Sequence, residues 1–182
     1  MSTKLQLKKL IGPLVACLMV LGLLLTSATP AFADEKTPPK ALPGLGKVTD
    51  DELIGMYKRL RSWYDDQAFV IRKAYDLAAD FQTLITYYKD KKGRDVTRLE
   101  VALAAFYDEI TAAEAARVNT NGIFTRNAGF NGYYYVLDRQ LAGQTILDAK
   151  MNLKGTHLSL MQAVLDLHRA FHGWREWLLN HN

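Results

Sequence analysis

The distribution of proline constrains this chain more than any other feature of its sequence. All five prolines lie before residue 44, and none follows up to Asn182. A proline inside a helix removes one backbone hydrogen bond and clashes with the preceding turn. The long stretch without proline can therefore form long helices, and no alternating strand pattern competes with the helical one there.

Apolar residues recur at alternating steps of four and three from residue 53 onward. The sequence from Thr49 to Glu52 is typical of a capping box, in which the Thr hydroxyl and the Glu carboxylate each accept a backbone amide at the helix start. The main row is Leu53, Tyr57, Leu60, Tyr64, Gln67, Ile71, Ala74, Ala78, Phe81, Ile85 and Tyr88. A second row beside it is Met56, Trp63, Val70, Leu77 and Leu84. Two rows make a wide buried face, which is typical of a helical bundle.

The end of the first helix is expected at Gly93, because glycine readily takes the left-handed cap conformation. A second helix is expected to begin at Asp95 or at Thr97, where Thr97 would open a second capping box. The same spacing continues over 99–124. This helix is expected to end either at 119–122, where Asn119-Thr120-Asn121-Gly122 favours a stop, or at about Asn127, because Phe124 stays in phase. With a stop at Gly93 and a start at Asp95 or Thr97, the turn between the first and second helices is expected to be short.

The last helical stretch leaves the number of helices open. Helical spacing is clearest there in Leu153, Leu160, Val164, Leu167, Phe171, Trp174 and Leu178. A turn at Gly155 would give four helices, whereas a weak point inside one long helix would give three. A glycine inside a helix costs only about 1 kcal/mol, and Leu153 and Leu160 stay in phase across it. We therefore expect an all-α, antiparallel bundle of three long helices, with four helices as the alternative.

Three segments are expected along the chain. Residues 1–33 form a cleavable signal peptide, residues 34–48 a Pro/Gly-rich linker, and residues 49–182 the helical bundle domain. Lysines before the apolar run 10–25, and Ala31-Phe32-Ala33 after it, indicate export and cleavage after Ala33. One alternative is a membrane anchor, since the run approaches the roughly 20 apolar residues that span a bilayer. The other is a lipoprotein acylated at Cys17.

Loss of residues 1–33 would change the charge and the chemistry of the chain. It removes three lysines and the only cysteine, and it leaves 20 basic against 19 acidic residues. A nearly neutral chain has no electrostatic reason to bind nucleic acid. Without cysteine it forms neither a disulfide nor a thiolate metal site. We expect no membrane span after cleavage, and we expect apolar packing to provide the stability.

Antiparallel neighbours bring the second half of the second helix beside the starts of the first and third helices. This end of the bundle combines Arg, Asn and Gln with Tyr and Trp, and the tyrosines at 133–135 are assigned to the third helix. Such residues suit a small ligand or a peptide, because rings give contact area and Arg can hold a carboxylate. The candidate ligand-binding residues are Tyr57, Arg61, Trp63, Arg117, Asn121, Tyr134 and Arg139. Alternatively, they form polar layers and solvated faces that fix the helix register.

Metal and haem sites have little support in the sequence. His168 and His172 share a helical face with Glu176, but zinc needs about four ligands. The Glu-x-x-His pairs of di-metal bundles are missing. A haem held by Met56 and a late His lacks an attachment motif. We therefore expect no metal and no other cofactor.

Catalytic patterns are equally sparse. The adjacent acids Asp65 and Asp66 point about 100° apart on a helix, so they cannot share one substrate. No phosphate loop, dinucleotide-binding pattern or nucleophile elbow is present. We expect an exported binding or scaffold protein of the cell envelope rather than an enzyme, with a small-ligand, metal- or haem-binding bundle as the alternative. Its partner is an unknown protein or small molecule, and a homo-oligomer is possible.

Overall fold

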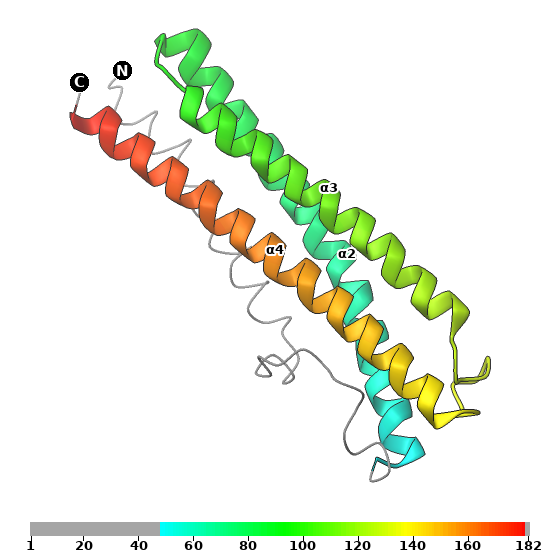
Figure 1. The fold of residues 1–182 in the computed structure, drawn as a ribbon. Coiled ribbons are helices and arrows are strands. Elements are labelled where there is room, and N and C mark those ends of the chain that lie inside the picture. The colour runs from blue at the N-terminus through cyan, green and yellow to red at the C-terminus, as the bar shows by residue number, and fades with distance from the viewer. Residues whose placement is uncertain (1–47, 181–182) are drawn as a thin grey trace.

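The computed structural model describes residues 48–180, which form three long helices (Figure 1). Helix α2 spans Asp50–Thr86 and continues as a short π-helix, η2, over Tyr87–Lys91. Helix α3 spans Thr97–Arg126, and α4 spans Arg139–Asn180. The three helices run side by side along one long axis, with α3 antiparallel to both α2 and α4. The predicted all-α bundle of three helices is confirmed, since α4 passes through Gly155 without a break.

Several expectations fall outside this range. The signal peptide at residues 1–33, nearly all of the linker at 34–48, and Cys17 lie before the first described residue, Val48. Within residues 48–180, none of the helices is both long enough and apolar enough to cross a bilayer.

Helix α2 begins where its sequence predicts, and its continuation η2 ends close to the predicted stop at Gly93. The Thr49 hydroxyl accepts the Glu52 amide at 3.3 Å, and a Glu52 carboxylate oxygen accepts the Thr49 amide at 2.7 Å. These reciprocal bonds form the predicted capping box. At the other end the chain leaves η2 at Gly93, whose φ of +56° is the left-handed conformation expected of a glycine cap.

The start of α3 differs from the predicted capping box. Its cap residue is Val96, which has no capping side chain, and the Thr97 amide donates instead to the Asp95 carboxylate at 3.0 Å. A Glu100 carboxylate oxygen accepts the Lys89 ammonium across the turn at 2.8 Å. Of the two predicted ends the later one is confirmed: α3 runs through 119–122 and stops at Asn127, which takes a left-handed conformation with a φ of +48°.

The predicted apolar rows face inward and form two separate cores. The larger core fills the half of the bundle near the α2–α3 turn, and it includes Ile71, Phe81, Phe106 and Leu167. The smaller core lies near the α3–α4 connection, and its buried members are Leu53, Tyr57, Leu60, Trp63, Tyr64, Phe124, Phe130, Ala142, Ile146, Ala149 and Leu153. Of the second predicted row only Met56 is half-buried rather than buried.

A polar belt separates the two cores along the chain. We define it by Gln67 on α2, Arg117 and Thr120 on α3, and Thr156 and His157 on α4. Four of these residues are buried, and Arg117 is half-buried. The Gln67 side-chain amide donates to the Leu153 carbonyl oxygen at 2.7 Å. Along the length of the bundle, the belt lies between the larger and the smaller core.

Candidate functional site

The connection between α3 and α4, residues 127–138, is an ordered loop that carries three consecutive tyrosines; we call it the tyrosine loop. Its backbone closes on itself through an isolated antiparallel bridge between Phe130 and Val136. The Asn131 side-chain oxygen accepts the amides of Tyr133 and Tyr135, each at 2.9 Å. These bonds fold the tyrosines into a compact turn. The prediction that residues 133–135 begin the third helix is therefore wrong, because asparagine satisfies local amides outside a helix.

Tyr134 anchors the loop in the smaller core. Its ring lies 5.6 Å from the Tyr57 ring, and Tyr57 also packs against Phe130 at 4.5 Å and edge-on against Phe124 at 5.4 Å. Tyr134 has a φ of +67°. A left-handed conformation is strained for a bulky residue, so the surrounding contacts have to hold it.

Close packing onto α4 also fixes the loop. Gly129 has a φ of +83°, and a Cβ atom there would lie 2.1 Å from the Ala142 amide nitrogen. The Thr145 hydroxyl donates to the Ala128 carbonyl oxygen at 2.8 Å. The Asp138 carboxylate accepts the amides of Gln140 and Leu141, so it caps the first turn of α4. The loop and the helix start therefore form one packed unit.

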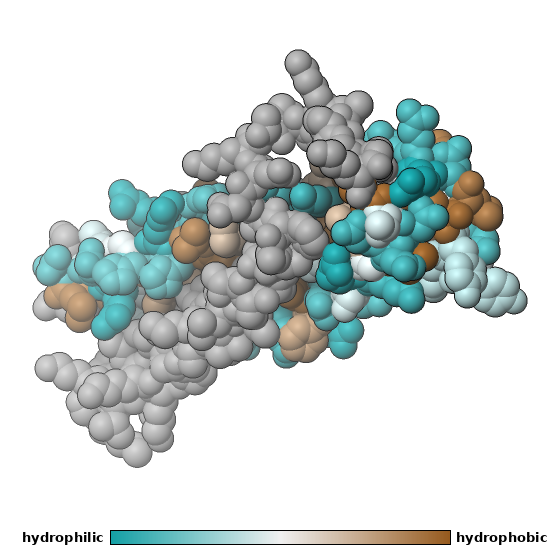
Figure 2. Space-filling model, turned by 90° about the horizontal axis from the view of Figure 1, so that it is seen from below, coloured by the Kyte–Doolittle hydropathy of each residue, from teal (hydrophilic) through white to brown (hydrophobic). Residues whose placement is uncertain are grey.

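Because Tyr134 points inward, its two neighbours point outward. The side chains of Tyr133 and Tyr135 are 83% and 64% exposed, and Leu137 and Leu141 beside them are 73% and 52% exposed. Figure 2 shows apolar surface gathered at this end of the bundle. Large exposed apolar side chains that cluster on one end are typical of an interaction surface.

The predicted ligand-binding residues occupy three different places. Tyr57 and Tyr134 lie together in the smaller core, and the Arg61 guanidinium stacks over the Phe124 ring at 5.1 Å beside them. Trp63 packs against His157 at 6.1 Å between ring centres, at the edge of the polar belt. All four residues contact other parts of the bundle.

The remaining predicted residues lie apart from Tyr57. The Arg117 guanidinium stacks over the Tyr64 ring at 4.2 Å. Arg139 forms an ion pair with Asp50 at 2.9 Å and donates to the Val48 carbonyl oxygen, so it joins the starts of α4 and α2. Asn121 is exposed. The structure thus brings together only part of the predicted set.

Burial accounts for the shifted pKa values of two side chains in this half of the bundle. It raises the pKa of the Tyr57 hydroxyl, which donates to the Phe124 carbonyl oxygen at 3.4 Å. It lowers the pKa of His157, because a charged imidazolium would lose its hydration. Both shifts follow from packing, and neither needs a nearby reactive group.

The sequence places all three tyrosines at this end of the bundle, but of these only Tyr134, which turns inward, is among the predicted ligand-binding residues. Leu137 and Leu141 were not predicted at all. The available signal was Asn131-Gly132, a pair that favours a turn and interrupts the helix before the tyrosines. Which tyrosine turns inward depends on contact with Tyr57, which is distant from the loop in sequence.

Two hollows lie at the opposite end of the bundle. One, of about 120 Å³, is lined by Asp95, Arg98, Trp174 and Trp177. Two of its polar residues bond to other groups: the Trp174 indole donates to the Asp95 carbonyl oxygen at 2.9 Å, and the Asp95 carboxylate accepts the Thr97 amide. These bonds hold the α2–α3 turn onto α4.

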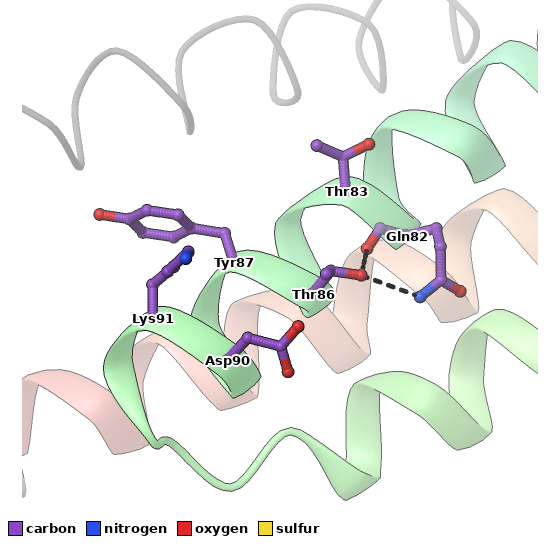
Figure 3. Close-up of a pocket in the computed structure, with 6 residues that line it drawn as sticks. All are labelled: Gln82, Thr83, Thr86, Tyr87, Asp90 and Lys91. Atoms are coloured by element: carbon purple, nitrogen blue, oxygen red, sulfur yellow. Dashed lines mark hydrogen bonds between the residues drawn. The ribbon is translucent and has the colours of Figure 1, made fainter.

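The second hollow is about 330 Å³, and its described lining comes from α2 and η2 alone (Figure 3). Its six lining residues are Gln82, Thr83, Thr86, Tyr87, Asp90 and Lys91. The Thr86 hydroxyl donates to the Gln82 carbonyl oxygen at 2.9 Å within the helix. Figure 3 shows the side chains spread along one helical surface, so they do not converge on a ligand.

Within residues 48–180, no group of three or more His, Cys, Asp or Glu side chains could hold a metal ion. His168 and His172 do lie near each other, with 6.2 Å between ring centres. His172 interacts with Glu176 on the same helix at 3.3 Å. These three side chains form an exposed helical surface.

The chain was compared with protein-family models, curated proteins and solved structures, and no match was found in any of the three.

Proposed function

We propose that this protein is an exported, non-enzymatic binding module of the cell envelope, and that the tyrosine loop contacts a protein partner. The observation that carries this proposal is the pair Tyr133 and Tyr135, held 83% and 64% exposed in a loop whose backbone is fixed. Export is inferred from the sequence at residues 31–33.

A fixed loop with exposed tyrosines suits protein recognition. Tyrosine offers a large contact area at a low cost in conformational entropy, and its hydroxyl supplies a hydrogen bond. The bonds from Asn131 and the inward Tyr134 order the loop before any partner arrives. Preorganisation of this kind reduces the entropy lost on binding.

A lipid surface is the other class of partner that exposed tyrosine and leucine could contact. Binding to an anionic membrane draws strength from clustered basic residues. After cleavage at Ala33 the chain would carry 20 basic against 19 acidic residues. Of the two arginines that flank the loop, Arg126 and Arg139, Arg139 is already paired with Asp50. The charge pattern therefore favours a protein.

Site-specific photo-crosslinking in the producing cell tests the proposal. A photoreactive phenylalanine analogue at position 133 should give a discrete adduct with one protein. The matched control places the same analogue at Phe69, an α2 residue that is 45% exposed and lies outside the loop. Position 69 should not give that adduct.

A second variant tests the tyrosines themselves. Tyr133→Ser combined with Tyr135→Ser should abolish copurification of the crosslinked protein, while the melting temperature stays within about 2 °C, because exposed substitutions change stability little. Equal adducts at positions 133 and 69 would contradict the proposal. So would flotation of the purified protein with vesicles that depends on the two tyrosines.

A further inference from the structure

Helix α4 carries a second apolar stripe that does not face the bundle core. Met151, Leu158, Leu165 and Leu179 are 47%, 46%, 42% and 61% exposed. They occupy one row of seven-residue spacing, in which His172 fills the remaining position. The core-facing row of the same helix, which includes Leu153 and Leu160, lies on another side.

The spacing of this stripe is that of a helix-pairing seam. Leu147 and Met161 are half-buried and lie at the intervening steps of four and three, so they widen the stripe toward the core. A strict seven-residue repeat drifts by about 20° per heptad on a straight helix, and a partner helix follows it by crossing in a left-handed sense. The stripe is therefore shaped for another long helix rather than for a globular surface.

The order of residues in the row is symmetric about Leu158. In an antiparallel pair of α4 helices centred there, Leu158 meets Leu158 of the second copy, and Met151 meets Leu165. One heptad further out, Gln144 meets His172, so polar residues meet polar residues. A two-fold interface requires a surface that is complementary to itself in this way.

Charge along the edge of the stripe favours the antiparallel direction. Asp148 and Arg169 lie on the same flank, ten and eleven residues from Leu158 in opposite directions. An antiparallel pair sets Asp148 of one copy beside Arg169 of the other, whereas a parallel pair places these flanks on opposite sides of the interface and leaves the two charges unmatched. Arg169 also pairs with Asp166 of its own helix in an exposed contact at 3.1 Å, which can rearrange.

We propose that the protein forms a two-fold homodimer in which the outer stripes of two α4 helices pack antiparallel, centred on Leu158. This inference is independent of the proposed function, because the tyrosines of the loop lie outside the stripe. The partner in this interface is a second copy of the same chain.

Sedimentation of the purified protein tests the dimer. The chain is expressed with its own N-terminal segment, so that the producing cell processes it. The native protein should sediment as a dimer, and Leu158→Asp should raise the dissociation constant by about a hundredfold, because the two-fold axis brings the two carboxylates together. The matched control is Val118→Asp, on the exposed side of α3 with 71% exposure, which should remain dimeric. A native protein that stays monomeric at all concentrations would overturn the proposal.

Disulfide crosslinking tests the direction and centre of the pairing. The background is Cys17→Ser, which removes the only cysteine. Leu158→Cys should crosslink with itself, and an equimolar mixture of Met151→Cys and Leu165→Cys should crosslink only as the mixed pair. Self-crosslinking of Met151→Cys and of Leu165→Cys would indicate a parallel pair and would overturn the antiparallel arrangement.

Discussion

His157 is the buried titratable side chain through which pH acts on folding. Burial lowers its pKa from the ordinary value of 6.5. In the unfolded chain the ring binds a proton as the pH falls through that value, whereas in the folded protein it stays neutral to lower pH. The unfolded state then binds more protons, so the free energy of unfolding falls as the pH decreases below 6.5.

Replacement of His157 by a residue that does not titrate should remove this dependence. We expect His157→Gln to have a flatter stability profile than the native protein between pH 6.5 and about pH 5, measured by urea unfolding. Glu52 and Asp95 also make the stability depend on pH, because backbone hydrogen bonds lower their pKa values. Their effect on the free energy of unfolding begins near pH 4.5 and pH 3.8, their ordinary pKa values, and extends below them. The control is His168→Gln at an exposed site. If the free energy of unfolding of His157→Gln fell with decreasing pH as steeply as that of the native protein, groups other than His157 would cause the loss of stability.

Gln67 is the polar member of an otherwise mostly apolar seam, and its side chain is only half satisfied. Its nitrogen donates to the Leu153 carbonyl oxygen, whereas its buried side-chain oxygen has no hydrogen-bond partner. A buried unpaired acceptor costs about 1–3 kcal/mol. We expect Gln67→Met, which keeps the length of the side chain, to raise the free energy of unfolding by about 1 kcal/mol.

The control for Gln67 is Gln82→Met on the exposed side of the same helix, which should change the stability by less than about 0.5 kcal/mol. Urea unfolding of both variants provides the comparison. A loss of stability in Gln67→Met would mean that the polar belt holds the helices together rather than setting their register.

At the scale of the helices, the sequence predicts most of what the structure shows. The proline-free stretch, the Thr49–Glu52 box and the glycine at 93 give the bounds of α2 together with η2. The row from Leu53 to Tyr88 is buried throughout. These features are local, because a helix, its caps and its buried face are set by residues within a few turns of each other.

The α3–α4 connection is predicted less well because its form depends on distant contacts. Asn131 signals a turn, but the inward position of Tyr134 requires the ring of Tyr57 from the start of α2. The approach of Gly129 to Ala142 likewise requires the packing of two elements. The sequence placed the tyrosines at the end of the bundle where α3 connects to α4, whereas the orientation of their side chains could not be predicted.

Replacement of Gly155 and of Gly129 by alanine is expected to change the free energy of unfolding in opposite directions. Gly155 lies inside α4, and nothing lies within 4 Å of a Cβ atom built there. Gly155→Ala should therefore raise the free energy of unfolding by about 0.5–1 kcal/mol, because alanine favours the helix. Gly129→Ala should lower it by about 2 kcal/mol or more, because of the positive φ and the contact with Ala142.

Thermal and urea unfolding of the two variants check these predictions. A loss of stability in Gly155→Ala would indicate a backbone that bends at this glycine, as in the four-helix alternative. A neutral Gly129→Ala would show that the tyrosine loop moves away from α4 at little cost.

At the scale of the whole molecule, the larger core is separated from the tyrosine loop. The larger core occupies one half of the bundle, and the polar belt marks its boundary. The smaller core carries the exposed tyrosines by holding Tyr134 in a strained conformation. Substitutions at Tyr133 and Tyr135 are thereby separated from the main source of folding free energy, as expected of a loop held on a rigid scaffold.

For the whole chain, cleavage by a signal peptidase is expected to set the N-terminus of the mature protein. Small residues at Ala31 and Ala33 fit the signal-peptidase pattern, so the mature protein should begin at Asp34. Ala33→Phe should accumulate as uncleaved precursor because a large side chain does not fit that pattern, whereas Ala31→Ser keeps a small residue and should be processed normally. Intact-mass measurement of each secreted or envelope fraction provides the readout. An acyl group on Cys17 would contradict cleavage after Ala33 and indicate a lipid anchor. Native protein that retains residues 1–33 in the membrane fraction would indicate that this segment is a membrane anchor.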